Sequence, residues 1–155
     1  MFLEKIEKTN DIKEIGAENY DALAEEIRQF LIQSISVTGG HLGSNLGAVE
    51  LTMALHLSLN LPEDKIIWDV GHQSYTHKIL TGRYNQFKTI RQKDGISGFC
   101  HPNESEHDTF YSGHSGTSVS SAFGIAQANQ IMNRDDYTVA VIGGSVYVNV
   151  DRKTG

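Results

Sequence analysis

The feature that most constrains the fold is a pair of short apolar segments rich in β-branched residues, residues 65–70 and 137–142. Each segment is followed at once by glycine, at Gly71 and Gly143. Segments of this length and composition, bounded by chain-breaking residues, are typical of strands buried on both faces. Helical patterns precede both segments. Helices that alternate with buried strands predict an α/β fold, with a parallel sheet flanked by helices.

Helical patterns extend over much of the remaining chain. Residues 18–36 predict an amphipathic helix, because apolar side chains recur every three or four positions from Leu23 to Ile35. Gly39 lies just past the end of this pattern, where glycine commonly ends a helix. Further helices are expected over residues 46–58, 72–80 and 115–132, and a loop is expected over residues 94–112.

Small residues form a stripe on the last of these predicted helices. Gly116, Ser120 and Gly124 are spaced four residues apart, so they share one helical face. A face of this kind predicts close packing of the helix backbone on a sheet or on a ligand.

Composition narrows the class of protein. The 155 residues fit one domain. Thirteen basic and nineteen acidic side chains give a net charge of −6, which argues against a nucleic-acid-binding protein. Cys100 is the only cysteine, and no segment approaches the ~20 consecutive apolar residues of a membrane helix. We therefore expect a soluble, cytoplasmic protein without nucleic-acid or membrane partners.

Histidine follows glycine at three predicted element boundaries, at His41, His72 and His114. Ligands of parallel α/β sheets bind where strand ends meet helix N-termini, and the free N–H groups there suit phosphate. Imidazoles at such places suit proton transfer near neutral pH or hydrogen bonds to an anion. The alternative is that each histidine is a structural hydrogen-bonding group in a glycine-rich turn. Three occurrences of one local pattern favour a ligand site.

Other patterns carry weaker signals. A structural zinc site is disfavoured, because Cys100-His101 has no second close ligand pair. The segment 78–93 holds five basic and no acidic residues, which indicates a solvated face or, alternatively, local attraction for an anionic substrate. Gly143-Gly144 after a strand is a weak indication of a phosphate-binding turn.

Four separated motifs together resemble the 1-deoxy-D-xylulose-5-phosphate synthase family, thiamine-diphosphate enzymes of the transketolase superfamily. The motifs are residues 39–47 (GGHLGSNLG), 65–83 (KIIWDVGHQSYTHKILTGR), 96–99 (ISGF) and 111–118 (YSGHSGTS). Their order and spacing agree with the family from about Asp21 to Gly144. The resemblance implies the N-terminal diphosphate-binding domain of such enzymes, truncated, over residues 1–144, with a divergent tail over residues 145–155.

The resemblance also implies an activity. Family members are transferases that condense pyruvate with glyceraldehyde 3-phosphate and release carbon dioxide, and their product feeds isoprene and terpenoid, thiamine and pyridoxal synthesis. Thiamine diphosphate and Mg²⁺ are the implied cofactors, and the full-length enzymes are expected to be homodimers.

Site residues carry over from the family by position. His41 matches a catalytic histidine that faces the reacting substrate and suits proton transfer. The positions implied to bind the cofactor are His72, Gly113, His114, Ser115, Ser44, Gly143 and Gly144.

The chain departs from the family at the metal site. Gly143-Gly144-Ser145 stands where the family has glycine-aspartate-glycine, so the magnesium-ligand aspartate is absent and no metal ligand is assigned. Gly116 stands where the family usually has serine. We expect this chain alone to be inactive and poorly soluble, with an unpaired sheet edge. The alternatives are a non-catalytic binding or regulatory protein and one half of a split enzyme.

Overall fold

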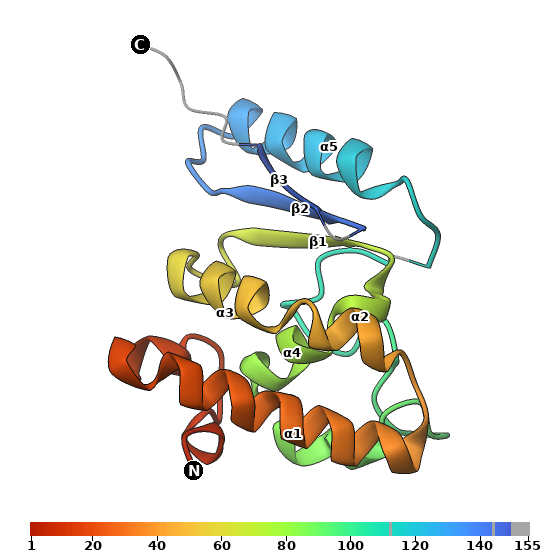
Figure 1. Cartoon of the computed structure of the whole chain (residues 1–155). Helices are drawn as coiled ribbons and strands as arrows, with labels where there is room; N and C mark the ends of the chain where they lie inside the picture. The colour runs from red at the N-terminus through yellow and green to blue at the C-terminus, as the bar shows by residue number, and fades with distance from the viewer. Residues whose placement is uncertain (112, 144, 150–155) are drawn as a thin grey trace. The chain divides into compact units, whose positions relative to one another are not determined.

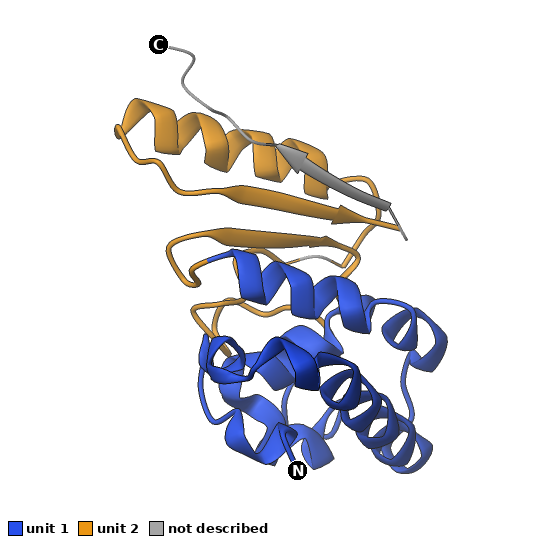
Figure 2. Cartoon of the chain, turned by 60° about the vertical axis from the view of Figure 1, so that its left-hand side comes forward, with its two compact units in different colours: residues 1–59, 72–98 blue, residues 60–71, 99–155 orange. Residues whose placement is uncertain are grey.

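The computed structural model describes residues 1–111, 113–143 and 145–149, the last range as a backbone strand. The chain forms two compact units, shown in different colours in Figure 2. Unit 1 comprises residues 1–59 and 72–98, and unit 2 comprises residues 60–71 and 99–155. Each unit is described by itself below.

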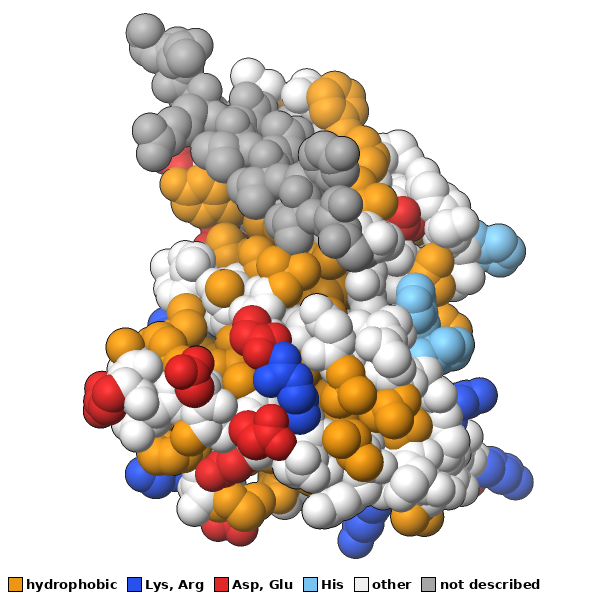
Figure 3. Space-filling model, in the orientation of Figure 1, with side chains coloured by type: hydrophobic (Ala, Val, Ile, Leu, Met, Phe, Trp, Pro, Cys, Tyr) orange, Lys and Arg blue, Asp and Glu red, His pale blue; other side chains and the backbone are white. Residues whose placement is uncertain are grey.

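Unit 1 is helical and has its own apolar core. Its elements are η1 (Leu3–Lys5), η2 (Asp11–Glu14), η3 (Ala17–Asn19), α1 (Tyr20–Thr38), α2 (Leu42–Leu46), α3 (Val49–Ser58), η4 (Gly71–Gln73), α4 (Tyr75–Lys78), η5 (Ile79–Arg83) and η6 (Tyr84–Thr89). Helix α1 packs against α2, α3 and η6, and α3 packs against α4 (Figure 1). The core includes Leu31, Tyr75 and Phe87, each fully buried. Acidic and basic side chains lie close together on the surface of this unit, as Arg28 and Glu50 do (Figure 3).

The first predicted helix is confirmed as α1. The side chains at Leu23, Ile27, Leu31 and Ile35 are buried, as their spacing predicts. Gly39 ends the helix with a φ of 72°, and its N–H donates to the Ile35 carbonyl at 2.9 Å. Glycine adopts this left-handed conformation without the steric cost that a Cβ imposes.

The second predicted helix, residues 46–58, is two helices. The short helix α2 ends at Leu46, and α3 begins at Val49. Gly47 lies at the break, and its N–H donates to the Gly43 carbonyl at 3.2 Å. Leu46 closes the first helix instead of opening the second, because the chain changes direction between them.

The predicted helix over residues 72–80 is also interrupted. It consists of the 3₁₀ turn η4, the single α-helical turn α4 and the wider π-helical turn η5. Thr81 and Gly82 have non-helical dihedral angles, with a φ of 85° at Gly82. A Cβ at Gly82 would lie 2.5 Å from the Glu7 carbonyl oxygen, so only glycine fits this close approach.

Unit 2 contains the sheet. Strands β1 (Lys65–Asp69) and β2 (Thr138–Ile142) pair in parallel, with Lys65 opposite Thr138, and helix α5 (Ser118–Ile131) packs against both strands (Figure 1). The α/β fold and the parallel pair are therefore confirmed. The predicted loop over residues 94–112 contains no helix or strand among its described residues.

The predicted small-residue stripe does not pack on the sheet, and its packing on a ligand stays a prediction. Gly116 precedes the helix, and Ser120 and Gly124 are exposed. The buried face carries Ser118, Ala122 and Ala126, and Ala122 contacts a small apolar cluster with Ile67 and Ala140. Both stripes consist of small residues at a spacing of four, so residue size alone does not distinguish them.

A third strand makes the sheet mixed. Strand β3 (Ser145–Asn149) pairs antiparallel with β2, with Ile142 opposite Ser145. Gly143, the first residue after β2, lies in the connection between the two strands. The strand order is β1-β2-β3, so β1 and β3 are the edges of the sheet that the described residues form. None of the helices in the described part of the chain is both long and apolar enough to span a bilayer.

Candidate functional site

Two of the three predicted histidines lie together in unit 1. His41 precedes α2 and is exposed, while His72 lies in η4 and is half-buried. Their ring centroids are 5.3 Å apart, with an angle of 64° between the ring planes. The edge of one imidazole therefore faces the other, although the two histidines are 31 positions apart in the sequence.

The amide of Asn45 joins the segments that carry these two imidazoles. Its Nδ2 donates to the backbone carbonyls of His41 and His72, both at 2.6 Å. Its Oδ1 accepts from the Tyr75 N–H at 2.9 Å. Asn45 is fully buried, so these bonds are shielded from competition with water.

Tyr75 lies beneath the loop that carries His41. A Cβ at Gly40 would stand 2.9 Å from the Tyr75 phenol oxygen, and the φ of Gly40 is 147°, so this position accepts only glycine without strain. Burial raises the pKa of the Tyr75 phenol, while the backbone of His41 and the charge of Arg91 act in the opposite direction. The phenol therefore stays protonated over a wider pH range than an exposed tyrosine.

The phenol oxygen of Tyr75 is buried without a hydrogen-bond partner, and so are two polar atoms of the histidine-bearing segments, Oγ of Ser44 and Nδ1 of His72. Such atoms are uncommon in native proteins, because an unsatisfied buried polar group costs about 1–3 kcal/mol. A bound ligand with a polar group could satisfy the latter two atoms. We therefore take His41, Ser44 and His72 as the candidate site in unit 1.

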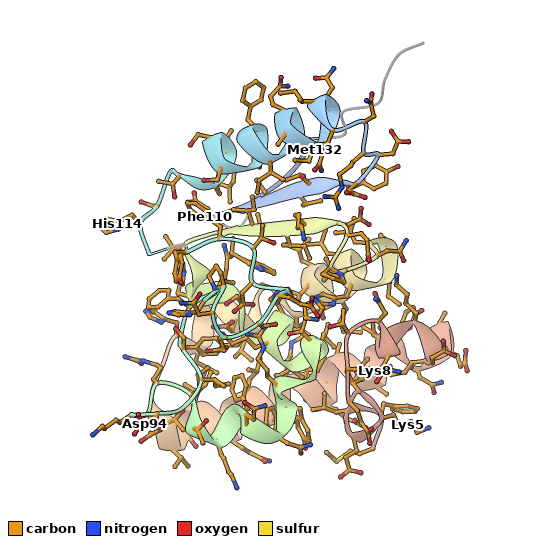
Figure 4. The ribbon with its side chains drawn as sticks, turned by 180° about the vertical axis from the view of Figure 1, so that it is seen from behind. Lys5, Lys8, Asp94, Phe110, His114 and Met132 are labelled. Carbon is orange, nitrogen blue, oxygen red and sulfur yellow. The ribbon has the colours of Figure 1, made fainter. Side chains whose placement is uncertain are left out.

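Gly113, His114 and Ser115 lie in unit 2, on the loop that precedes α5, and all three are exposed. His114 points away from the ribbon in Figure 4. Asp69, at the end of β1, accepts the Gly116 N–H at 2.7 Å and holds this loop. Gly116 has a φ of 85°, which glycine adopts readily, so glycine fits this position better than the serine usual in the family. That His114 shares a site with His41 and His72 stays a prediction.

The remaining predicted site residues follow β2. Gly143 has a φ of 28° and lies in the connection to β3, while Gly144 lies outside the described residues. Within the residues that the structure describes, no three histidine, cysteine, aspartate or glutamate side chains are grouped to hold a metal ion.

The basic segment does not form one solvated face. Lys78 is fully buried and Arg83 is 5% exposed, whereas Lys88, Arg91 and Lys93 are exposed. The prediction of a solvated face is therefore wrong for the first two residues, which belong to helical turns packed into unit 1. The three exposed cations leave the anion-attracting alternative open for residues 88–93.

Three residues of these sites were not predicted. Asn45 and Tyr75 lie in unit 1, and Asp69 lies in unit 2. The sequence gives one indication of a role for Asn45, which is that it is a polar residue between Leu42 and Leu46. Tyr75 and Asp69 carry no comparable signal, because their roles depend on backbone groups far away in the sequence.

The parallel strand pair covered by α5 belongs to the α/β class of folds, whose ligands commonly bind where strand ends and helix N-termini meet. The family model for 1-deoxy-D-xylulose-5-phosphate synthase matches residues 3–148, and the chain belongs to this family. Curated relatives carry the same name. The chain is 58% identical to the synthase of Lachnoclostridium phytofermentans over 141 residues, and 59% identical to that of Alkaliphilus oremlandii over 143 residues.

These alignments cover most of this chain and a small part of each relative. They span 91% of the chain and 23% of the Lachnoclostridium phytofermentans protein, and 92% and 23% for the Alkaliphilus oremlandii protein. The synthase of Halothermothrix orenii is 56% identical over 140 residues, which are 90% of this chain and 22% of that protein. The chain therefore spans about a quarter of the length of its curated relatives.

Proposed function

We propose that this chain supplies the imidazole-bearing part of the active site of a thiamine-diphosphate-dependent transferase. The reaction would be that of the relatives' name, in which pyruvate and glyceraldehyde 3-phosphate give 1-deoxy-D-xylulose 5-phosphate and carbon dioxide. The observation that carries the proposal is the 5.3 Å approach of the His41 and His72 rings in a chain of this family. The complete reaction requires groups beyond this segment, so the chain alone is expected to be inactive.

His41 is the proposed proton-transfer residue. Its ring is exposed at the start of α2, so a substrate can reach it, and imidazole gains and loses a proton near neutral pH. His72 lies beside it and is the proposed cofactor contact. Gly113, His114 and Ser115 are proposed to contact the cofactor from the loop before α5.

The residues of unit 1 fit thiamine diphosphate, because Nδ1 of His72 and Oγ of Ser44 are polar atoms that still lack a partner. When bound, this cofactor would supply a nucleophilic carbon for addition to the carbonyl of pyruvate and would take up the electron pair that the loss of carbon dioxide releases. The residues beside Gly143 do not fit magnesium. The family's aspartate is absent at this turn, and the described residues offer no group of three ligands. No step through the metal is therefore assigned to this chain.

A split enzyme or a regulatory subunit is the second proposal. Unit 1 folds around an apolar core of its own, as a part that works together with a separate chain requires. A separate chain that carries the remaining domains would complete the site in a split enzyme. A regulatory subunit would instead bind a full-length synthase. Carbon dioxide would then be released at the active site of that synthase alone.

A chimera tests the first proposal. In the chimera, residues 3–142 of this chain replace the matching segment of the Lachnoclostridium phytofermentans synthase. Everything after strand β2 comes from that synthase. Carbon dioxide release from pyruvate and glyceraldehyde 3-phosphate is expected from the chimera and not from this chain alone. His41→Gln in the chimera should lower kcat by about a hundred- to ten-thousand-fold, the usual contribution of acid–base catalysis.

Gln33→Ala is the matched control, because Gln33 is exposed on α1 and lies in neither histidine-bearing segment. It should leave the rate of the chimera unchanged. A folded chimera that binds the cofactor and releases no carbon dioxide would contradict the proposal. Full activity of the His41→Gln chimera would remove His41 from the mechanism.

A further inference from the structure

Asn45 joins two backbone segments of unit 1, its own segment over residues 41–45 and the distant segment over residues 72–75. Its side chain bonds to the carbonyl of His41, to the carbonyl of His72 and to the N–H of Tyr75, at 2.6, 2.6 and 2.9 Å. The second and third partners lie 27 and 30 residues away in the sequence. The side chain is fully buried, so water does not replace these bonds.

The chemistry of the three partners selects asparagine. Two carbonyl oxygens require two N–H donors, and one backbone N–H requires an acceptor, which is the set that a primary amide offers on a short side chain. An aspartate at this position would place a carboxylate against two carbonyl oxygens. A leucine would leave the two carbonyls and the N–H buried without partners, which is destabilising.

The two carbonyl partners belong to the residues of the candidate site itself. Each bond fixes the backbone from which an imidazole extends, and the rings then lie with centroids 5.3 Å apart. The bond to Tyr75 holds the residue whose phenol supports the loop at Gly40. We infer that Asn45 is a positioning residue that sets the separation of the His41 and His72 imidazoles. Its importance for catalysis rests on the proposed function.

Thr52 provides a matched comparison in the same unit. Its side chain is also fully buried, and its hydroxyl donates to the Ala48 carbonyl at 2.6 Å. Thr52 and Ala48 lie four residues apart at the start of α3. Their bond therefore stabilises the first turn of that helix and does not connect the two histidine-bearing segments. Loss of the Thr52 bond therefore tests general destabilisation without removing a contact to either histidine.

The test uses nuclear magnetic resonance on the full chain, with ring signals assigned from His41→Gln and His72→Gln. The wild-type chain should show a nuclear Overhauser effect between the two imidazoles and slow exchange of the Tyr75 amide hydrogen. Asn45→Ala and the milder Asn45→Ser should lose the inter-ring effect while circular dichroism still reports a folded chain. The Tyr75 amide should exchange about tenfold faster in both variants, as expected for one lost buried hydrogen bond.

Thr52→Val should retain the inter-ring effect and the slow Tyr75 exchange. The inference is overturned if a folded Asn45 variant keeps the inter-ring effect, or if Thr52→Val loses it as well. If neither Asn45 variant folds, the two measurements on the wild-type chain test the inference. A wild-type chain without the inter-ring effect, or with fast exchange of the Tyr75 amide, would overturn it. None of these signals requires turnover, so an inactive chimera would refute the proposed function and leave this result standing.

Discussion

The two units differ in how completely each buries its apolar surface. Unit 1 encloses a core that runs from Leu3 to Ile96. In unit 2, the helix that covers the strands leaves large apolar side chains in water, with Phe123 57% and Ile131 81% exposed. Met132, at the end of the same helix, is also exposed (Figure 4).

The two units also differ in how firmly their predicted site residues are held. His41 and His72 extend from segments that a buried amide joins, whereas His114 extends from an exposed loop in which Asp69 accepts the Gly116 N–H. A site assembled on a packed core keeps its geometry before a ligand binds. The candidate site in unit 1 is therefore the one that a buried side chain on a packed core holds in place.

The largest effect is expected from the core of unit 1. Leu31→Ala removes a fully buried side chain of α1 and should lower the free energy of unfolding by about 2–5 kcal/mol. Val37→Ala on the same helix is the control, because Val37 is 86% exposed and its truncation should cost about 0.5 kcal/mol or less. Urea unfolding measures both changes. Equal losses would show that unit 1 lacks the packed core described here.

A smaller effect is expected at the loop of unit 2. Asp69→Ala removes the acceptor of the Gly116 N–H and should cost about 1–3 kcal/mol of unfolding free energy, with faster exchange of the Gly116 amide. Asp69→Asn retains an oxygen acceptor and should cost less. If the alanine variant leaves the exchange of the Gly116 amide unchanged, the Asp69 carboxylate does not hold this loop. The hydrogen bond of Asp69 would then no longer distinguish unit 2 from unit 1.

The smallest effect concerns Tyr75 at alkaline pH. Because the pKa of its phenol is raised in the folded chain, the unfolded chain ionises first as the pH rises. The contribution of Tyr75 to stability is therefore complete below the ordinary tyrosine pKa of about 10 and declines above it. Tyr75→Phe should flatten the fall of unfolding free energy above that pH. An unchanged alkaline slope would show that the phenol is not held in the neutral form.

The sequence carried enough information for the elements whose signal is local. Helix α1 followed from its apolar period and Gly39, and β1 and β2 followed from short apolar runs ended by glycine. The break at Gly47 and the interrupted turns near Gly82 were not predicted, and contacts with residues distant in the sequence decide the latter. One example is the approach of the Glu7 carbonyl to Gly82.

The candidate site was predicted in its residue types and only partly in its geometry. The repeated glycine-histidine pattern identified His41 and His72, which the structure brings together. Asn45 was missed, because its partners lie up to 30 residues away and no periodic pattern reports them. The antiparallel return of β3 was missed because a glycine pair after a strand is compatible with both a phosphate turn and a hairpin.

The central claim is that this chain holds the imidazole part of a cofactor site that other segments must complete. Calorimetric titration of thiamine diphosphate with magnesium, into this chain and into the chimera, tests it most directly. We predict micromolar binding by the chimera, weakened at least about tenfold by His72→Ala, and no saturable binding at these concentrations by the chain alone. Micromolar binding by the chain alone, or a chimera indifferent to His72→Ala, would contradict the claim.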